Sequence, residues 1–114
     1  MEEPGLRYMR NDLIVVKMIE LIDRLQKFVG ESDYETFCEN GMLVDACVFN
    51  LSQLGEQANK IDEEFEEMHP DISWREIYGL RNRIVHDYEG VNLKLIWQII
   101  SEDLPELKEA LEKI

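Results

Sequence analysis

The stretch RNRIVHDY, residues 81–88, combines residue types that could act together on a phosphate ester. Arg81 and His86 are five positions apart, Tyr88 follows two positions later, and Asn82 comes directly after the arginine. An arginine can neutralise the negative charge that grows on a phosphate during phosphoryl transfer. A histidine can exchange a proton with a ribose 2′-hydroxyl or with a leaving oxygen near neutral pH. The set is therefore suited to ribonuclease chemistry that needs no metal.

A helical wheel gives Arg81 an unusual position within the predicted helix that carries this stretch. At about 100° per residue, Arg81 lies about 20° from Trp74, and Tyr88 lies on the same face. His86 follows Asn82 by four positions, so these two side chains share the flank of that face. We therefore expect the guanidinium to stand where a core side chain normally would, because the face is formed by Trp74, Ile77, Tyr78, Ile84 and Val85.

Two interpretations of Arg81 are open, because a charge on an apolar face has to be paired or has to meet an anion. The first is structural: a salt bridge to a carboxylate of a neighbouring helix, for which Glu56 is a candidate. The second is functional: the face borders a cleft or a subunit interface, where Arg81 binds an anionic ligand. His86 and Tyr88 also have structural interpretations, as a solvated or capping histidine and as a core tyrosine.

Helical signals dominate the rest of the chain. Apolar residues recur at helical spacing over residues 11–29 and 42–61, and Gly30 can end the first of these helices in the left-handed conformation. Asn50 falls within the apolar face of the second, where a buried amide needs hydrogen-bond partners. Two S-x-x-E sequences match capping boxes, in which a serine caps a helix and a glutamate three residues later caps it in return. These boxes are Ser32 with Glu35 and Ser73 with Glu76.

The sequence of the last third of the chain contains further signals for the ends of helices. Gly90 can terminate the motif helix near Glu89, and Asn92 can cap the helix that follows. Asp103 can cap a last helix, with Pro105 in its first turn. Valine and isoleucine recur at helical rather than alternating spacing, so we expect no strand. Four or five helices with short connections predict an all-α fold, an antiparallel up-and-down bundle.

Length and composition bound the class of protein. The 114 residues fit a single domain, residues 1–114. They contain no apolar run of the roughly 18 residues that a membrane span needs, and the start of the sequence has no signal-peptide pattern. We therefore expect a cytoplasmic protein without a membrane partner. Cys38 and Cys47 match no zinc spacing, so both are expected to be free and buried, with no metal or cofactor.

The net charge of −13 opposes binding to a phosphate backbone, because that affinity comes mainly from lysine and arginine. A local cationic patch can still bind an anion on an acidic protein. Arg75, Arg81 and Arg83 form such a cluster along the motif helix, diluted by Asp87 and Glu89. We therefore expect weak binding of RNA, or a preference for one structured RNA such as tRNA.

RNRIVHDY resembles the R-x4-H-x-Y signature of HepT-like toxins in the HEPN superfamily. Here the signature reads Arg81, four residues, His86, one residue, Tyr88, and Asn82 is the polar residue that the superfamily favours after the arginine. LGEQANKI, residues 54–61, resembles the family's glycine–glutamate stretch on an earlier helix. SWREIYGLRNRIVHDYEGVNLKLIWQII resembles its signature region and DLPELKEAL its tail. The resemblance therefore covers nearly the whole chain.

The resemblance implies a metal-independent endoribonuclease, the toxin of a toxin–antitoxin pair, with Arg81 and His86 catalytic. It implies a homodimer whose two motifs face each other in a cleft. It also implies an MNT-type nucleotidyltransferase antitoxin that transfers AMP to Tyr88 and so blocks the cleft. Asn82 would support catalysis by orienting His86 or the phosphate. Glu56 matches a family position, and its pairing with Arg81 is a hypothesis.

Two other interpretations stay open. Related HEPN proteins serve as non-catalytic partners of minimal nucleotidyltransferases and bind a nucleotide or substrate, which suits the acidic charge. The chain could also be a structural helical protein in which the motif is accidental. The complete set of Arg81, His86 and Tyr88 favours the ribonuclease, because a binding partner has no need of all three.

Overall fold

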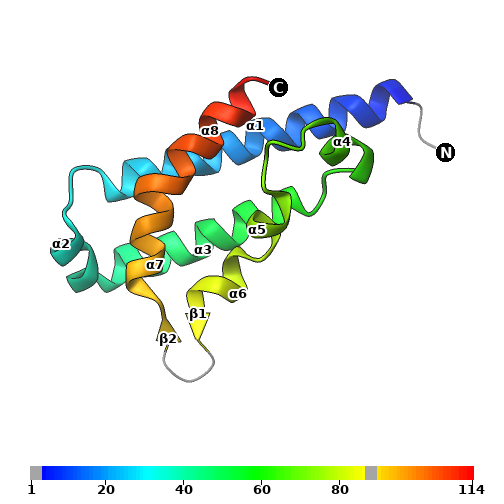
Figure 1. Cartoon of the computed structure of the whole chain (residues 1–114). Coiled ribbons are helices and arrows are strands. Elements are labelled where there is room, and N and C mark those ends of the chain that lie inside the picture. Colours follow the sequence, from blue (N-terminus) through cyan, green and yellow to red (C-terminus); the bar gives the residue numbers. More distant parts are fainter. Residues whose placement is uncertain (1–3, 87–89) are drawn as a thin grey trace.

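The computed structural model describes residues 4–86 and 90–114 (Figure 1), so predictions that concern Asp87, Tyr88 and Glu89 lie outside the described residues. The chain forms an all-α bundle, as the sequence predicts. In chain order the elements are α1 (Pro4–Val29), α2 (Tyr34–Glu39), α3 (Gly41–Ala58), α4 (Glu63–Met68), α5 (Trp74–Tyr78), α6 (Leu80–Ile84), β1 (Val85–His86), β2 (Gly90–Val91), α7 (Leu93–Gln98), the π-helical segment η1 (Ile99–Asp103) and α8 (Leu104–Glu112).

The bundle is built around two long helices, α1 and α3, which pack against each other along their lengths and run in opposite directions (Figure 1). The α7–η1–α8 helix packs on α1, and α5 and α6 pack on α3. Each of these helices contributes buried apolar side chains to one core, including Met18, Ile22, Leu25, Leu51, Leu54, Ile77, Leu80, Ile84, Ile96, Ile99 and Leu111. No helix in the described part of the chain has the length and apolar character that crossing a membrane requires.

The predicted end of the first long helix is confirmed, but the two predicted capping boxes do not form. Gly30 ends α1 with a φ of 56°, as expected. The cap of α2 is Asp33 rather than Ser32: its carboxylate accepts a hydrogen bond of 2.8 Å from the N–H of Thr36. An aspartate at this position satisfies the free N–H groups of the first turn as well as a serine would. Ser73 is the N-cap of α5, but its hydroxyl makes no capping hydrogen bond, so the second box also fails to form.

Helix α3 carries a buried polar side chain that the sequence pattern singles out. Asn40 caps the helix by accepting a hydrogen bond of 3.1 Å from the N–H of Leu43. Asn50 is 4% exposed. Its amide donates to the carbonyl of Ala46 at 2.7 Å and accepts from Arg24 of α1 at 3.5 Å. The buried amide is therefore satisfied, and it links the two central helices.

The prediction of one continuous motif helix to residue 89 is wrong. Gly79, with φ −89° and ψ 7°, separates α5 from α6, and α6 ends at Ile84. Val85 is extended, and β1 pairs with β2 in a short antiparallel ladder, so the expectation of no strand is also wrong. Gly90 does not cap a helix; it lies in β2 with a φ of 82°. The N–H of Asn92 then donates to the carbonyl of Ile84 at 2.7 Å, which closes the hairpin.

The last helix continues through the site at which a new start was predicted. Asn92 caps α7 as expected, by accepting from the N–H of Leu95 at 3.1 Å. Asp103 is itself helical and makes no capping hydrogen bond. The N–H of Leu104 bonds to the carbonyl of Ile99, five residues earlier, so a π turn comes directly before Pro105. Because proline has no N–H to donate, this wider turn lets the helix pass from α7 into α8.

Candidate functional site

The motif residues lie at the end of the bundle where α6 passes into the hairpin (Figure 1). Arg81 and Asn82 belong to α6, and both are exposed. His86 is the second residue of β1, and its backbone pairs with Gly90. Tyr88 lies outside the described residues. The structure thus puts the arginine and the histidine on two different elements, and β1 begins at Val85, directly after α6 ends at Ile84.

The predicted position of Arg81 on the apolar face is wrong. Leu80, which is 4% exposed, takes the core position, and Arg81 points outward. The physical reason is the break at Gly79, which changes the phase between Trp74 and the residues after it. The guanidinium therefore carries no burial cost, and its position does not require a paired carboxylate.

Arg81 and Asn82 line a polar pocket of about 140 Å³ between α3 and the α5–α6 segment, which we call the motif pocket. The structure therefore brings Glu56 together with both motif residues, although they are 25 and 26 positions apart in the sequence. The wall is formed by Ser52, Gly55, Glu56, Asn59, Tyr78, Arg81 and Asn82.

Arg81 has no ion pair and no hydrogen bond with any residue that the structure describes. Glu56 is exposed and lies in the same pocket, but its carboxylate is not within 4.0 Å of the guanidinium. Their pairing stays a hypothesis that would require the two side chains to move closer together. In the described arrangement, the guanidinium is available to an anion that enters the motif pocket.

Tyr78 is a pocket residue that the sequence reasoning placed only in the core. Its hydroxyl is buried and has no hydrogen-bond partner among the described residues. A buried hydroxyl without a partner typically costs about 1–3 kcal/mol of stability. A group that came within hydrogen-bonding distance of the Tyr78 hydroxyl would remove this cost. Ser52 and Asn59 were also missed. Together with Glu56 they follow one face of α3, whose C-cap residue is Asn59, at spacings of four and three, a pattern that could have revealed them.

Gly55 sets how closely α3 approaches the segment that carries Arg81. A Cβ atom at this position would lie 2.9 Å from the carbonyl oxygen of Ile77 and 3.6 Å from that of Tyr78. Any side chain at Gly55 would therefore force the backbone of α3 and that of the α5–α6 segment apart. The absence of a side chain at Gly55 therefore fixes the position of its neighbour, Glu56, relative to the α5–α6 segment.

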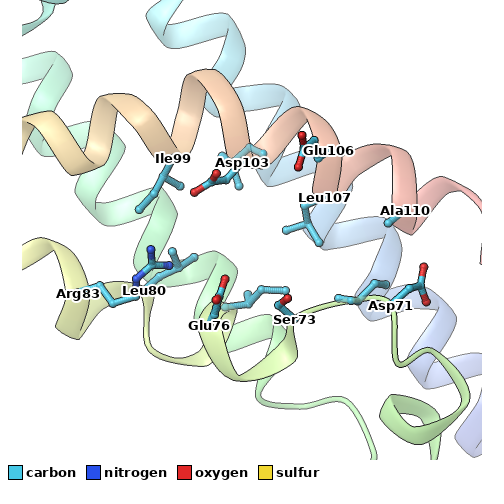
Figure 2. A pocket seen from close by; sticks show the side chains of 13 residues that line it. Asp71, Ser73, Glu76, Leu80, Arg83, Ile99, Asp103, Glu106, Leu107 and Ala110 are labelled. Atoms are coloured by element: carbon cyan, nitrogen blue, oxygen red, sulfur yellow. The ribbon is translucent and has the colours of Figure 1, made fainter.

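A second cavity of about 210 Å³ lies on another side of α5 and α6, facing η1 and α8. Figure 2 shows Leu107 reaching from α8 toward the α5–α6 segment, from which Glu76 and Arg83 project. Four carboxylates surround an apolar floor, and Arg83 is the single basic side chain in the wall: the acids are Asp71, Glu76, Asp103 and Glu106. This cavity repels phosphate and is unsuited to RNA.

The predicted cluster of three arginines is divided in the structure. Arg81 lines the motif pocket, and Arg83 lines the second cavity. Arg75 lies near Glu66 of α4: burial raises the pKa of the Glu66 carboxyl, and the positive charge of Arg75 opposes this rise. The motif pocket therefore holds one positive charge and one negative charge, from Arg81 and Glu56. Residues 4–86 and 90–114 contain no group of three histidine, cysteine or acidic side chains placed to hold a metal ion.

Known proteins resemble the chain over most of its length. The family described as "Ribonuclease HepT-like" matches residues 18–114. "Putative RNase MJ1380" of Methanocaldococcus jannaschii is 34% identical over 95 residues, which are 83% of this chain and 87% of that protein. "Probable ribonuclease HepT" of Thermococcus cleftensis is 33% identical over 83% of this chain and 86% of its own. No solved structure is significantly similar. The chain therefore belongs to the HepT-like ribonuclease family.

Proposed function

We propose that this chain is a metal-independent endoribonuclease and the toxin of a type II toxin–antitoxin pair. Arg81 binds the scissile phosphate and stabilises its growing charge. His86 transfers a proton, and Asn82 orients the phosphate or the histidine. The observation that carries the proposal is the guanidinium of Arg81, which stands in a polar pocket beside Asn82 with no partner among the described residues. The ribonuclease names of the relatives support the same chemistry.

We further propose a homodimer in which the two motifs face each other. Met42 and Phe49 of α3 are 86% and 61% exposed, and Glu56 follows Phe49 by seven residues, as Phe49 follows Met42. Residues seven apart lie on nearly the same side of a helix. Large exposed apolar side chains in one row favour a protein contact. That row leads to the motif pocket, so a second copy docked on α3 would cover the pocket and form a cleft.

Regulation of this ribonuclease is proposed to act through Tyr88. An MNT-type nucleotidyltransferase antitoxin would transfer AMP to the tyrosine, two positions after His86. The added phosphate is an anion and would compete with RNA for Arg81. Incubation with that enzyme and ATP should raise the mass of the chain by one or more AMP units. A Tyr88→Phe variant should gain none and should stay active in its presence.

The substrate is proposed to be cytoplasmic RNA, either tRNA or mRNA. With a net charge of −13 and one arginine in the motif pocket, the chain should bind RNA weakly, and the affinity should fall as salt is added. A dissociation constant that does not change between low and physiological salt would contradict a site in which Arg81 neutralises a phosphate.

A second candidate function is a non-catalytic partner of a minimal nucleotidyltransferase that binds a nucleotide. The acidic net charge of the chain favours it, and so does the balance of one positive and one negative charge in the motif pocket. Expression without the antitoxin separates the two functions. Toxicity that disappears in His86→Ala supports the nuclease, whereas harmless expression of the unmodified chain supports the binding partner.

The variant Arg81→Ala tests the role of the arginine, and Arg83→Ala is its matched control on the same helix. Both residues are exposed, but Arg83 lines the second cavity. We expect both variants to keep the wild-type unfolding free energy within about 0.5 kcal/mol. RNA cleavage should be lost only in Arg81→Ala. Equal effects of the two changes on cleavage would contradict a specific phosphate site at Arg81.

A further inference from the structure

The motif pocket contains a carboxylate where a simple phosphate site would have none. Glu56 is the pocket's acidic side chain, and it is not paired with Arg81 in the described arrangement. A negative charge next to a bound phosphate weakens binding, as two like charges repel. Phosphate binding alone therefore gives no reason for Glu56 to face the same pocket as Arg81, and a second role for the carboxylate has to be considered.

Cleavage of RNA through the ribose 2′-hydroxyl needs two proton transfers. One group removes the proton of the hydroxyl, and another protonates the leaving oxygen. The chain has two histidines, His69 and His86. The ring of His69 packs against Phe65 with the ring centroids 4.6 Å apart, at the end of α4, and it is not a lining residue of the motif pocket. One chain therefore offers one histidine, and the second proton-transfer group has to be of another kind or come from another chain.

We propose that Glu56 is the general base of the reaction, an assignment that rests on the ribonuclease function proposed above. Its carboxylate takes the proton of the 2′-hydroxyl. The 2′-oxygen forms a bond to phosphorus, the bond between phosphorus and the 5′-oxygen breaks, and that oxygen takes a proton from His86. The products are a 2′,3′-cyclic phosphate and a 5′-hydroxyl end. Glu56 then supplies the base of the reaction and His86 the acid.

The surroundings of Glu56 suit this role. Arg81 from α6 is the charged group across the pocket, and Tyr78 from α5 is the other titratable group; the remaining side chains of the wall are neutral. A phosphate bound by Arg81 lies in the same pocket of about 140 Å³ as the carboxylate. The 2′-hydroxyl is on the sugar attached to that phosphate, so it comes within reach of Glu56. The positive charge of Arg81 offsets the repulsion between the carboxylate and the phosphate.

The first test compares Glu56→Gln with Glu102→Gln, the same change at an exposed acid of η1 that is outside the motif pocket. Single-turnover cleavage is measured with saturating RNA, and binding is measured with the same RNA carrying a 2′-deoxy sugar at the cleaved position. Loss of the base should lower the rate by about 10²- to 10⁴-fold, with binding unchanged or tighter. Glu102→Gln should match the wild type. A rate within a few fold of the wild type, or a loss explained by weaker binding, would overturn the assignment.

The second test distinguishes the base from the acid. In an RNA with sulfur in place of the 5′-oxygen at the cleaved bond, the leaving group needs no proton. His86→Ala should regain cleavage on this substrate, whereas Glu56→Gln should stay slow. The opposite pattern would make Glu56 the acid and overturn the proposal.

A mixture of the two variants tests whether both groups belong to one chain. Neither chain in the mixture has both groups, so an assignment within one chain predicts no recovery of cleavage. Recovery would show that Glu56 of one copy acts with His86 of another. If the wild-type chain cleaves and Glu56→Gln is equally active, only the role of Glu56 fails. If the wild-type chain does not cleave RNA, the proposed function fails and this assignment fails with it.

Discussion

The contact at Gly55 allows a quantitative prediction, because helix propensity and packing give opposite signs there. In the interior of α3, an alanine in place of glycine would gain about 1 kcal/mol from helix propensity. The added Cβ would lie 2.9 Å from the carbonyl oxygen of Ile77, a backbone atom that cannot rotate away. Overpacking of this kind costs about 1–3 kcal/mol. We expect strain in the upper part of this range, so Gly55→Ala should lower the unfolding free energy by about 1–2 kcal/mol.

The matched control is Gly41→Ala, in the first turn of the same helix. A Cβ atom at Gly41 would have no neighbour within 4 Å, so this change should be neutral or stabilising. Urea unfolding followed by circular dichroism gives both free energies, and the melting temperature of Gly55→Ala should fall by roughly 5–10 °C. Cleavage should also fall, because α5 and α6 would move away from Glu56. A Gly55→Ala variant as stable as the wild type or more stable would refute the close contact.

Three further outcomes follow from buried polar groups. Asn11, which is 2% exposed, donates to Asp62 Oδ2 and accepts from the Asp62 N–H, both at 3.3 Å. Asn11→Ala should therefore lower the free energy of unfolding in urea by about 1–3 kcal/mol. A loss no greater than that of the exposed control Asp12→Ala would contradict this. Burial raises the pKa of the Cys47 thiol to about 11, so a thiol reagent at pH 8 should modify Cys38 alone in the native chain; labelling of both would contradict the burial. Because the native thiol keeps its proton to higher pH than the unfolded one, its contribution to stability is complete below about pH 9 and should be lost as the pH rises toward 11, a loss absent from Cys47→Ala.

The helical architecture could be predicted because its signals are local. Apolar residues at helical spacing mark α1 and α3, Gly30 stops the first helix, and Asn92 caps the helix after the hairpin. The buried amide of Asn50 was also visible as a polar residue within an apolar stripe, although its partner Arg24 was not. Each of these features depends on residues within a few positions of one another.

The errors concern positions where competing local choices are close in energy. Ser32 and Asp33 are adjacent, and both can cap a helix, so one residue decides where α2 begins. The sequence around Gly79 is helical on both sides, and a glycine in a helix is only mildly unfavourable. The break that it makes here gives Leu80 the core position and turns Arg81 outward. The wheel assumed one continuous helix and therefore assigned the arginine to the wrong face.

The site was predicted in part. Arg81, Asn82 and Glu56 were named from the motif and from an earlier helix, and the structure places all three in one pocket. Tyr78, Ser52 and Asn59 could not be assigned to it, because which faces of α3 and α5 meet depends on the close contact at Gly55. The roles of all the named site residues stay predictions: Arg81, Asn82, Glu56, His86 and Tyr88.

The most direct test of the central claim is RNA cleavage by the purified chain, with its unmodified mass verified, beside His86→Ala and in excess chelator. The assay uses tRNA and mRNA, and both proteins are first shown to have the same helical content. The proposed function predicts cleavage by the wild type and none by His86→Ala. No cleavage of either RNA by the wild type would contradict a metal-independent ribonuclease, and equal cleavage by both proteins would contradict the catalytic role of His86.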